Sequence, residues 1–144
     1  MPLTKVASGG ELARTMLALR LVLSSGPNTL VFDEVDAGIG GEAAVAVAQA
    51  LALLGKRHQV LVVTHLPQVA AAGHAHIQVS KSVRNGKTYA QAATLSEEER
   101  IAEIARMLSG GVAEATALEH ARELLRDSHK SDANSQASPK RSRR

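Results

Sequence analysis

Two adjacent carboxylates and a histidine each follow a short apolar run in this 144-residue sequence. Asp33 and Glu34 follow the run 29–32, and His65 follows the run 59–64. One carboxylate can hold a metal ion through water, and a second can take a proton from an attacking water. An imidazole can donate a hydrogen bond to a phosphoryl oxygen. Acids at the end of a strand are equally compatible with a plain exit into a solvated loop, and a lone histidine there with a structural role.

A second group of polar residues precedes a predicted helix near the N-terminus. Ser8 and Glu11 form an S-x-x-E capping box, which indicates that the helix begins at Ser8. Gly9 and Gly10 leave backbone N–H groups bare at the positive end of the helix dipole. These features predict an anion site that a phosphate could occupy. The alternative is that Ser8 only caps the helix and the glycines only form a turn.

Two buried strands and a helix between them must position these groups. The runs 29–32 and 59–64 are apolar or β-branched without alternation, which is typical of parallel strands covered on both faces. Between them, a glycine-rich loop containing Asp36 leads into a helix predicted over 42–54. Strand, helix and strand form a βαβ unit, and neighbouring parallel strands end at the same edge of a sheet. We therefore expect His65 and the acids to share one site at that edge.

The second half of the chain predicts a hairpin and three helices. A short helix over 67–72 precedes two strands, 77–82 and 87–92, which flank an Asn-Gly turn signal. Ser96 opens a second capping box, and a last helix is predicted over 113–126. These two C-terminal helices are given no chemistry.

A metal pair is conceivable at His74 and His76, which are two residues apart. No carboxylate accompanies them, so a structural role is favoured.

Composition favours one domain with an aliphatic core. Hydrophobic residues make up 44% of the chain and aromatics 1%, and the absence of Cys excludes disulfides and thiolate metal sites. No stretch reaches the ~20 apolar residues of a membrane span, and no signal pattern opens the chain.

The residues from Asp127 onward carry five basic and two acidic side chains, which accounts for the whole net charge of +3. This Ser-rich segment, 127–144, is expected to be disordered, and either contacts nucleic-acid phosphates or only improves solubility.

The order of these motifs resembles the C-terminal half of an ABC-type ATPase head: signature motif, Walker B strand, D-loop and switch histidine. The amino-acid sequences of the segments 6–12, 32–41 and 64–70 are similar to those of the bacterial RecN family, DNA repair relatives of the SMC proteins. The likeness extends from about residue 3 to residue 125. It implies an α/β fold, a partial P-loop NTPase head, with parallel strands flanked by helices and a β-hairpin appendage. Residues 1–126 would form the C-terminal lobe of this head.

The resemblance also implies roles for individual residues. Asp33 would hold the hydration shell of Mg²⁺, Glu34 would orient or deprotonate the attacking water, and His65 would contact the γ-phosphate of ATP. Asp36 would shape the subunit boundary within the nucleotide site. The signature residues Ser8, Gly9, Gly10 and Glu11 would bind the ATP carried by an opposing head. ATP would then be hydrolysed only between two dimerised heads, in DNA double-strand-break repair and recombination.

One family motif is missing from the sequence. No Gly-x-x-x-x-Gly-Lys-Ser/Thr occurs, although this loop cradles the β- and γ-phosphates. The resemblance therefore implies a C-terminal fragment that requires an N-terminal Walker A half, a second head and, through the full-length protein, DNA, in a cytoplasmic, nucleoid-associated setting. Two alternatives are a non-catalytic module that docks on or regulates an intact head, and a free-standing metal hydrolase using Asp33, Glu34 and His65.

Overall fold

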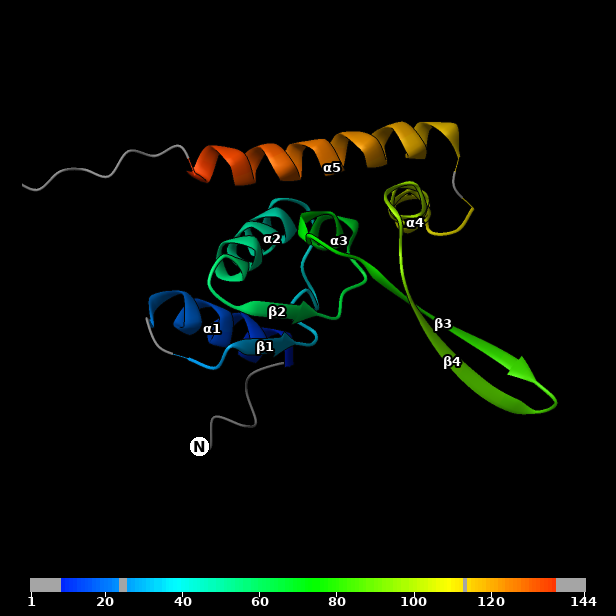
Figure 1. The fold of residues 1–144 in the computed structure, drawn as a ribbon, viewed down its shortest axis with the longest axis horizontal. Helices are drawn as coiled ribbons and strands as arrows, with labels where there is room; N and C mark the ends of the chain where they lie inside the picture. The colour runs from blue at the N-terminus through cyan, green and yellow to red at the C-terminus, as the bar shows by residue number, and fades with distance from the viewer. Residues whose placement is uncertain (1–8, 24–25, 113, 137–144) are drawn as a thin grey trace, which may run out of the picture.

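A computed structural model describes residues 9–23, 26–112 and 114–136 as a mixed α/β fold (Figure 1). Helix α1 (Gly9–Val22) is followed by strand β1 (Thr29–Phe32), helix α2 (Gly41–Gly55) and strand β2 (Gln59–Val62). The two strands pair in parallel, from Thr29 opposite Gln59 to Phe32 opposite Val62. The predicted βαβ unit is thus confirmed. Ser8 lies outside the described residues, so its capping role stays a prediction.

The β1–β2 pair is covered on one face. Leu30 and Phe32 are 8% and 6% exposed, whereas Val31 between them is 66% exposed. Leu61 and Val63, which lie on the same side as Val31, are 46% and 61% exposed. The buried face packs against residues of α1 and α2, namely Leu17, Ala48, Leu51 and Leu54. The predicted burial of both faces is therefore wrong for the described residues, because both neighbouring helices contribute to the same core.

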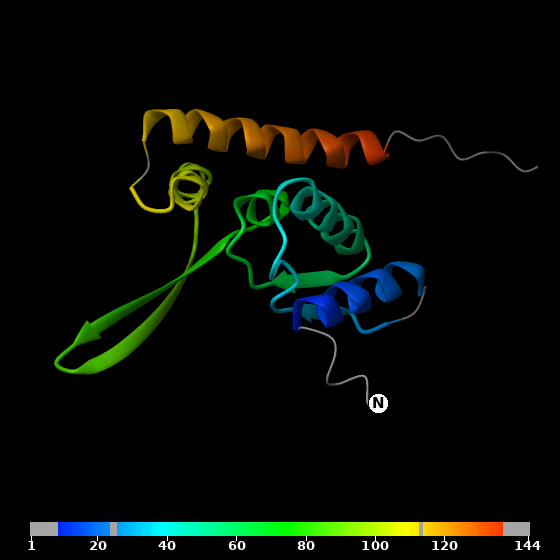
Figure 2. The ribbon, with the colours of Figure 1, turned by 180° about the vertical axis from the view of Figure 1, so that it is seen from behind.

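Helix α3 (Pro67–Ala72) lies between α2 and α4 (Glu97–Ser109) (Figures 1 and 2) and contributes to two hydrophobic clusters. Its Val69 belongs to the cluster around β1 and α2, while Ala70 and Ala71 belong to a second cluster. Helices α4 and α5 (Ala115–Gln136) supply the rest of that second cluster. The short helix α3 therefore connects the two hydrophobic clusters.

The predicted hairpin is confirmed and extends away from the helices (Figures 1 and 2). Strands β3 (Ile77–Arg84) and β4 (Lys87–Thr94) pair in antiparallel fashion and are each longer than predicted. The two turn residues, Asn85 and Gly86, have φ angles of 51° and 72°. Positive φ at both positions is what a tight two-residue hairpin turn requires, and Asn-Gly adopts it readily.

Helix α4 has the predicted capping box. The Glu99 N–H donates to the Ser96 hydroxyl at 3.3 Å, and the Ser96 N–H donates to the Glu99 carboxylate at 2.8 Å. These hydrogen bonds lower the pKa of Glu99. The helix ends at Ser109 and is capped by Gly110, whose φ of 67° is the left-handed conformation that glycine favours at a helix C-terminus.

The last helix is longer than the sequence predicted. α5 runs to Gln136, so the expected disorder from Asp127 is wrong for residues 127–136, and residues 137–144 lie outside the described part. No Gly or Pro occurs between Ala113 and Ser138 to stop the helix. The Ser128 hydroxyl donates to the Leu124 carbonyl at 2.8 Å, continuing the helical contacts. Searched over the described residues, no helix is long and apolar enough to cross a membrane.

Candidate functional site

The loops that follow β1 and β2 meet at one edge of the sheet. The Val63 N–H donates to the Phe32 carbonyl at 2.9 Å, so the parallel pairing continues one step past the ends of the strands. The loop after β1 carries Asp33, Glu34 and Asp36, and the loop after β2 carries His65. The sequence-predicted acids and the imidazole are thus delivered to a common edge, as their positions after parallel strands require.

Asp36 is the buried centre of this edge. Its side chain is 2% exposed, and the carboxylate accepts hydrogen bonds from the Thr64 hydroxyl and, at 3.1 Å, from the His65 N–H. The His65 Nδ1 lies 3.4 Å from the same Asp36 oxygen. The Thr64 hydroxyl also accepts a hydrogen bond from the Leu66 N–H at 3.0 Å. Asp36 therefore fixes the loop that carries His65, while its role at a subunit boundary stays a prediction.

Glu34 lies against the start of α1. A Cβ at Gly9 would collide with the Glu34 carboxylate, which places that carboxylate beside the helix N-terminus. Glu34 has a φ of 58°, which turns the chain sharply after β1. Asp33 is exposed, and no hydrogen bond or ion pair joins Glu34 to His65 in the described part. The edge therefore holds two pairs: His65 with Asp36, and Glu34 with the α1 N-terminus.

The second signature glycine also makes room for the loop after β1. A Cβ at Gly10 would lie 3.0 Å from both the Cβ and the carbonyl oxygen of Ala37. Arg14, one turn further along α1, donates hydrogen bonds to the carbonyls of Val35 at 3.3 Å and Ala37 at 2.9 Å. Sequence reasoning missed Arg14. The available signal was a charged residue three positions before Leu17, on the inward side of the helix.

Arg100 is a second positioning residue that sequence reasoning missed. It is 8% exposed, and its guanidinium donates to the carbonyls of Ala70 at 3.1 Å, Ala71 at 3.0 Å and Gly73. These carbonyls lie at the end of α3, where a helix leaves acceptors unpaired. Burial lowers the pKa of Arg100. Because α3 begins two residues after His65, Arg100 holds the far end of the segment that carries the histidine.

The base of the hairpin is attached to α4 through Glu103. This carboxylate, 9% exposed, accepts hydrogen bonds from the Gln78 amide at 2.7 Å and from Arg106 at 2.7 and 2.8 Å. The hydrogen bonds from Arg106 hold the pKa of Glu103 below its usual range and raise the pKa of Arg106. Burial, and then the charge of Arg100, lower the pKa of nearby His76. The middle of α4 therefore carries a buried polar cluster and not only an apolar stripe.

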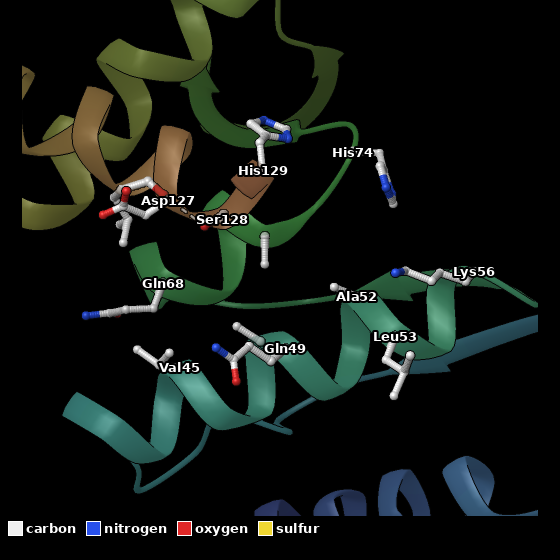
Figure 3. Close-up of a pocket in the computed structure, with 13 residues that line it drawn as sticks. Val45, Gln49, Ala52, Leu53, Lys56, Gln68, His74, Asp127, Ser128 and His129 are labelled. Carbon is white, nitrogen blue, oxygen red and sulfur yellow. Dashed lines mark hydrogen bonds between the residues drawn. The ribbon is translucent and has the colours of Figure 1, made fainter. Parts of the chain in front are cut away.

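A groove lies away from the sheet edge, between α2, α3 and the middle of α5. Its volume is about 660 Å³. Figure 3 shows His74, Asp127 and His129 around it, with Val45 and Leu53 of α2 on the other side. None of the predicted site residues lines it. His74 faces this groove while His76 faces α4, and the described residues contain no group of three His, Cys, Asp or Glu that could hold a metal ion.

Sequence comparison identifies the relatives of this chain. No family model matches it. It is 59% identical over 124 residues to the DNA repair protein RecN of Deinococcus radiodurans, a match that covers 86% of the chain and 22% of that protein. The identity is 52% over 127 residues to RecN of Treponema pallidum, covering 87% of the chain and 22% of the relative. For RecN of Vibrio cholerae it is 48% over 126 residues, covering 86% and 23%.

The chain thus spans between a fifth and a quarter of the length of these curated relatives, 22% to 23%. The mixed α/β fold, with a parallel pair and an antiparallel hairpin, is consistent with a partial ABC-type ATPase head. By sequence, the chain matches the C-terminal part of the DNA repair proteins named RecN.

Proposed function

We propose that this chain supplies one side of an ATP-hydrolysing site that forms between two dimerised heads, and that it acts in double-strand-break repair and recombination. The observation that supports the proposal is the parallel pairing of β1 and β2, which brings Asp33, Glu34 and His65 to one sheet edge. The relatives are named DNA repair proteins, which supports the broader part of the proposal, a role in DNA repair.

Asp33 is the residue proposed to hold Mg²⁺. It is an exposed oxygen ligand, and the described residues offer no protein cage of three or more metal ligands. Mg²⁺ suits such a site because it keeps several waters and uses one or two carboxylates together with substrate phosphates. When bound, the ion would neutralise charge that develops on the phosphates.

Glu34 and His65 are proposed to act on the attacking water and the γ-phosphate. Glu34 would orient that water or accept its proton. The Nδ1 side of His65 faces Asp36 at 3.4 Å, and the side chain is 72% exposed. A carboxylate facing Nδ1 favours a proton on that nitrogen, so Nε2 can donate a hydrogen bond to a phosphoryl oxygen when both ring nitrogens carry a proton. Asp36 thereby sets the direction in which the imidazole can act.

Dimerisation would change the surroundings of Glu34. Its carboxylate lies beside Gly9 at the α1 N-terminus, a place that favours an anion. In the proposed dimer, the phosphate of ATP bound to the opposing head would contact Ser8, Gly9 and Gly10 at this same place. The phosphate and the carboxylate would compete, so an arriving phosphate would displace Glu34 toward the water. Hydrolysis would then depend on head closure.

The open face of the sheet is the proposed docking place of the Walker A half. Val31, Leu61 and Val63 expose an apolar surface there. The N-terminal part of the longer relatives would cover this face and supply the missing phosphate loop. The alternative, a module that docks on an intact head and regulates it without turnover, uses the same face.

Reconstitution distinguishes the two functions. The chain is mixed with a separately produced N-terminal half of the Deinococcus radiodurans relative, and ATP turnover is followed by phosphate release. Turnover that appears only in the mixture and is lost with Glu34→Gln supports the ATPase. Glu42→Gln, at an exposed acid in the first turn of α2, is the matched control and should retain turnover. Docking without turnover supports the regulatory module, and metal-dependent turnover by the isolated chain contradicts both.

A further inference from the structure

The β3–β4 hairpin has two chemically different faces. Its register places Ile77, Val79 and Val83 on one face, 55%, 67% and 72% exposed, together with Lys81. The opposite face carries polar side chains toward the tip, Ser82, Arg84, Lys87 and Tyr89. An amphipathic ribbon of this kind can pack its apolar face on protein while its polar face remains available for another partner.

The tip of the hairpin concentrates positive charge. Residues 77–94 contain Lys81, Arg84 and Lys87 and no Asp or Glu. Arg84 and Lys87 lie directly opposite each other across the turn. Neither forms an ion pair in the described part of the chain. Like charges directly opposite in a sheet destabilise the pairing, and an anion bound between them would relieve that repulsion.

The hairpin is also shaped and anchored as a binding arm. Each strand has eight residues, so at about 3.4 Å per residue the ribbon is about 27 Å long. Figures 1 and 2 show it extending from the body. Its base is fixed by the Gln78–Glu103 hydrogen bond of 2.7 Å and by the Leu95 N–H, which donates to the His76 carbonyl at 2.9 Å. The major groove of B-DNA, about 12 Å wide, admits a two-stranded ribbon.

We propose that the polar face of this hairpin binds the phosphate backbone of duplex DNA. Arg84 and Lys87 form the charged contacts, and the hydroxyls of Ser82 and Tyr89 on the same face donate further hydrogen bonds to phosphate oxygens. The choice of DNA among polyanions rests on the proposed function in DNA repair, whereas the choice of an anion rests on the charges themselves.

Binding of a fluorescent duplex of about 30 base pairs to the full chain tests this proposal, using fluorescence anisotropy over about 50 to 300 mM salt. Each phosphate contact contributes about 0.9 to the slope of log K against log salt. The double variant Arg84→Gln/Lys87→Gln should lower that slope by about two and weaken binding at least tenfold at the lowest salt. Arg122→Gln/Arg126→Gln removes the same charge from exposed positions on α5 and should leave both quantities near wild type.

The competing binding surface is the basic C-terminus. A variant with Lys140, Arg141, Arg143 and Arg144 replaced by Gln should keep the hairpin-dependent part of the slope. A slope lost with this variant but unchanged by the hairpin variant overturns the proposal. So does the absence of duplex binding by the wild type, or hairpin-dependent binding to anionic lipid vesicles that exceeds binding to duplex.

Two further measurements separate loss of binding from loss of fold or of ATPase function. Arg84→Lys keeps the charge and should retain wild-type binding. Thermal melts should show the double variant Arg84→Gln/Lys87→Gln at least as stable as wild type, because the opposed charges are gone. The double variant should also support wild-type ATP turnover in the reconstituted mixture without DNA. Turnover without hairpin-dependent binding refutes this proposal alone, and the reverse result refutes the proposed ATPase alone.

Discussion

Replacing Asp36 by alanine tests how the loop after β2, which carries Thr64 and His65, is held in place. The carboxylate accepts hydrogen bonds from the Thr64 hydroxyl and the His65 N–H, and it is 2% exposed. Hydrogen bonds to a charged group are worth about 1.5 to 3 kcal/mol each, and an unpaired buried donor costs about 1 to 3 kcal/mol. Thr64 is half-buried, so water can reach part of the cluster, and the variant no longer buries a charge. We expect Asp36→Ala to lower the free energy of unfolding by about 3 kcal/mol.

Urea denaturation followed by circular dichroism measures this loss. Thr64→Val should cost about 1.5 kcal/mol, and the double variant about as much as Asp36→Ala alone, which corresponds to a coupling of about 1.5 kcal/mol. Asp33→Ala is the matched control. It removes an exposed carboxylate three residues away, so its effect on stability should stay within about 0.5 kcal/mol, while it should abolish turnover in the reconstituted mixture.

Two results would refute this reasoning. One is an equal effect of Asp36→Ala and Asp33→Ala on the free energy of unfolding. The other is strict additivity of Asp36→Ala and Thr64→Val, because side chains joined by a hydrogen bond should be coupled. The His65 amide resonance provides an independent check, since Asp36→Asn replaces a carboxylate oxygen facing that N–H and should shift the resonance.

Three other perturbations follow from the second half of the chain. Arg100→Met should lower the free energy of unfolding by about 2 to 4 kcal/mol because it leaves carbonyls at the end of α3 unpaired, whereas Arg122→Met, at an exposed ion pair, should change it by less than about 0.5 kcal/mol. Burial lowers the pKa of His76 from 6.5, so protonation favours the unfolded chain: thermal stability should fall as pH drops below 6.5, and His76→Gln should reduce that fall. Gly110→Ala should destabilise by about 1 kcal/mol because of its φ of 67°, and Gly111→Ala, where φ is not in the left-handed range, should be nearly neutral in the same melts.

Local sequence signals were sufficient where one segment decided the outcome. The unalternated run 29–32, the breakers around it and the second run ending near Val62 predicted β1 and β2 and their parallel order. Asn85 and Gly86 predicted the hairpin because few other pairs adopt positive φ at both turn positions. The common edge of His65 with the acids followed from the same parallel pairing.

What the sequence did not predict depends on contacts between distant segments. A strand's composition indicates that it can be buried, but whether both faces are covered depends on which helices lie over them, and Val31 faces no described element. The roles of Arg14 and Arg100 cannot be predicted from the local sequence pattern, because the carbonyls to which they donate hydrogen bonds are more than twenty residues away. The extent of α5 depended on the absence of Gly and Pro more than on its polar, Ser-rich composition.

The position of His65 is therefore fixed from two sides. On one side, the Asp36 carboxylate holds the backbone N–H of His65 and the hydroxyl of Thr64. On the other side lies α3, which has six residues and is too short to be stable by itself. Its place depends on packing into both hydrophobic clusters and on the hydrogen bonds from Arg100 to its last carbonyls. Helix α4, for which no chemistry was predicted, thus contributes through Arg100 to one of the two supports of the predicted phosphate-contacting histidine.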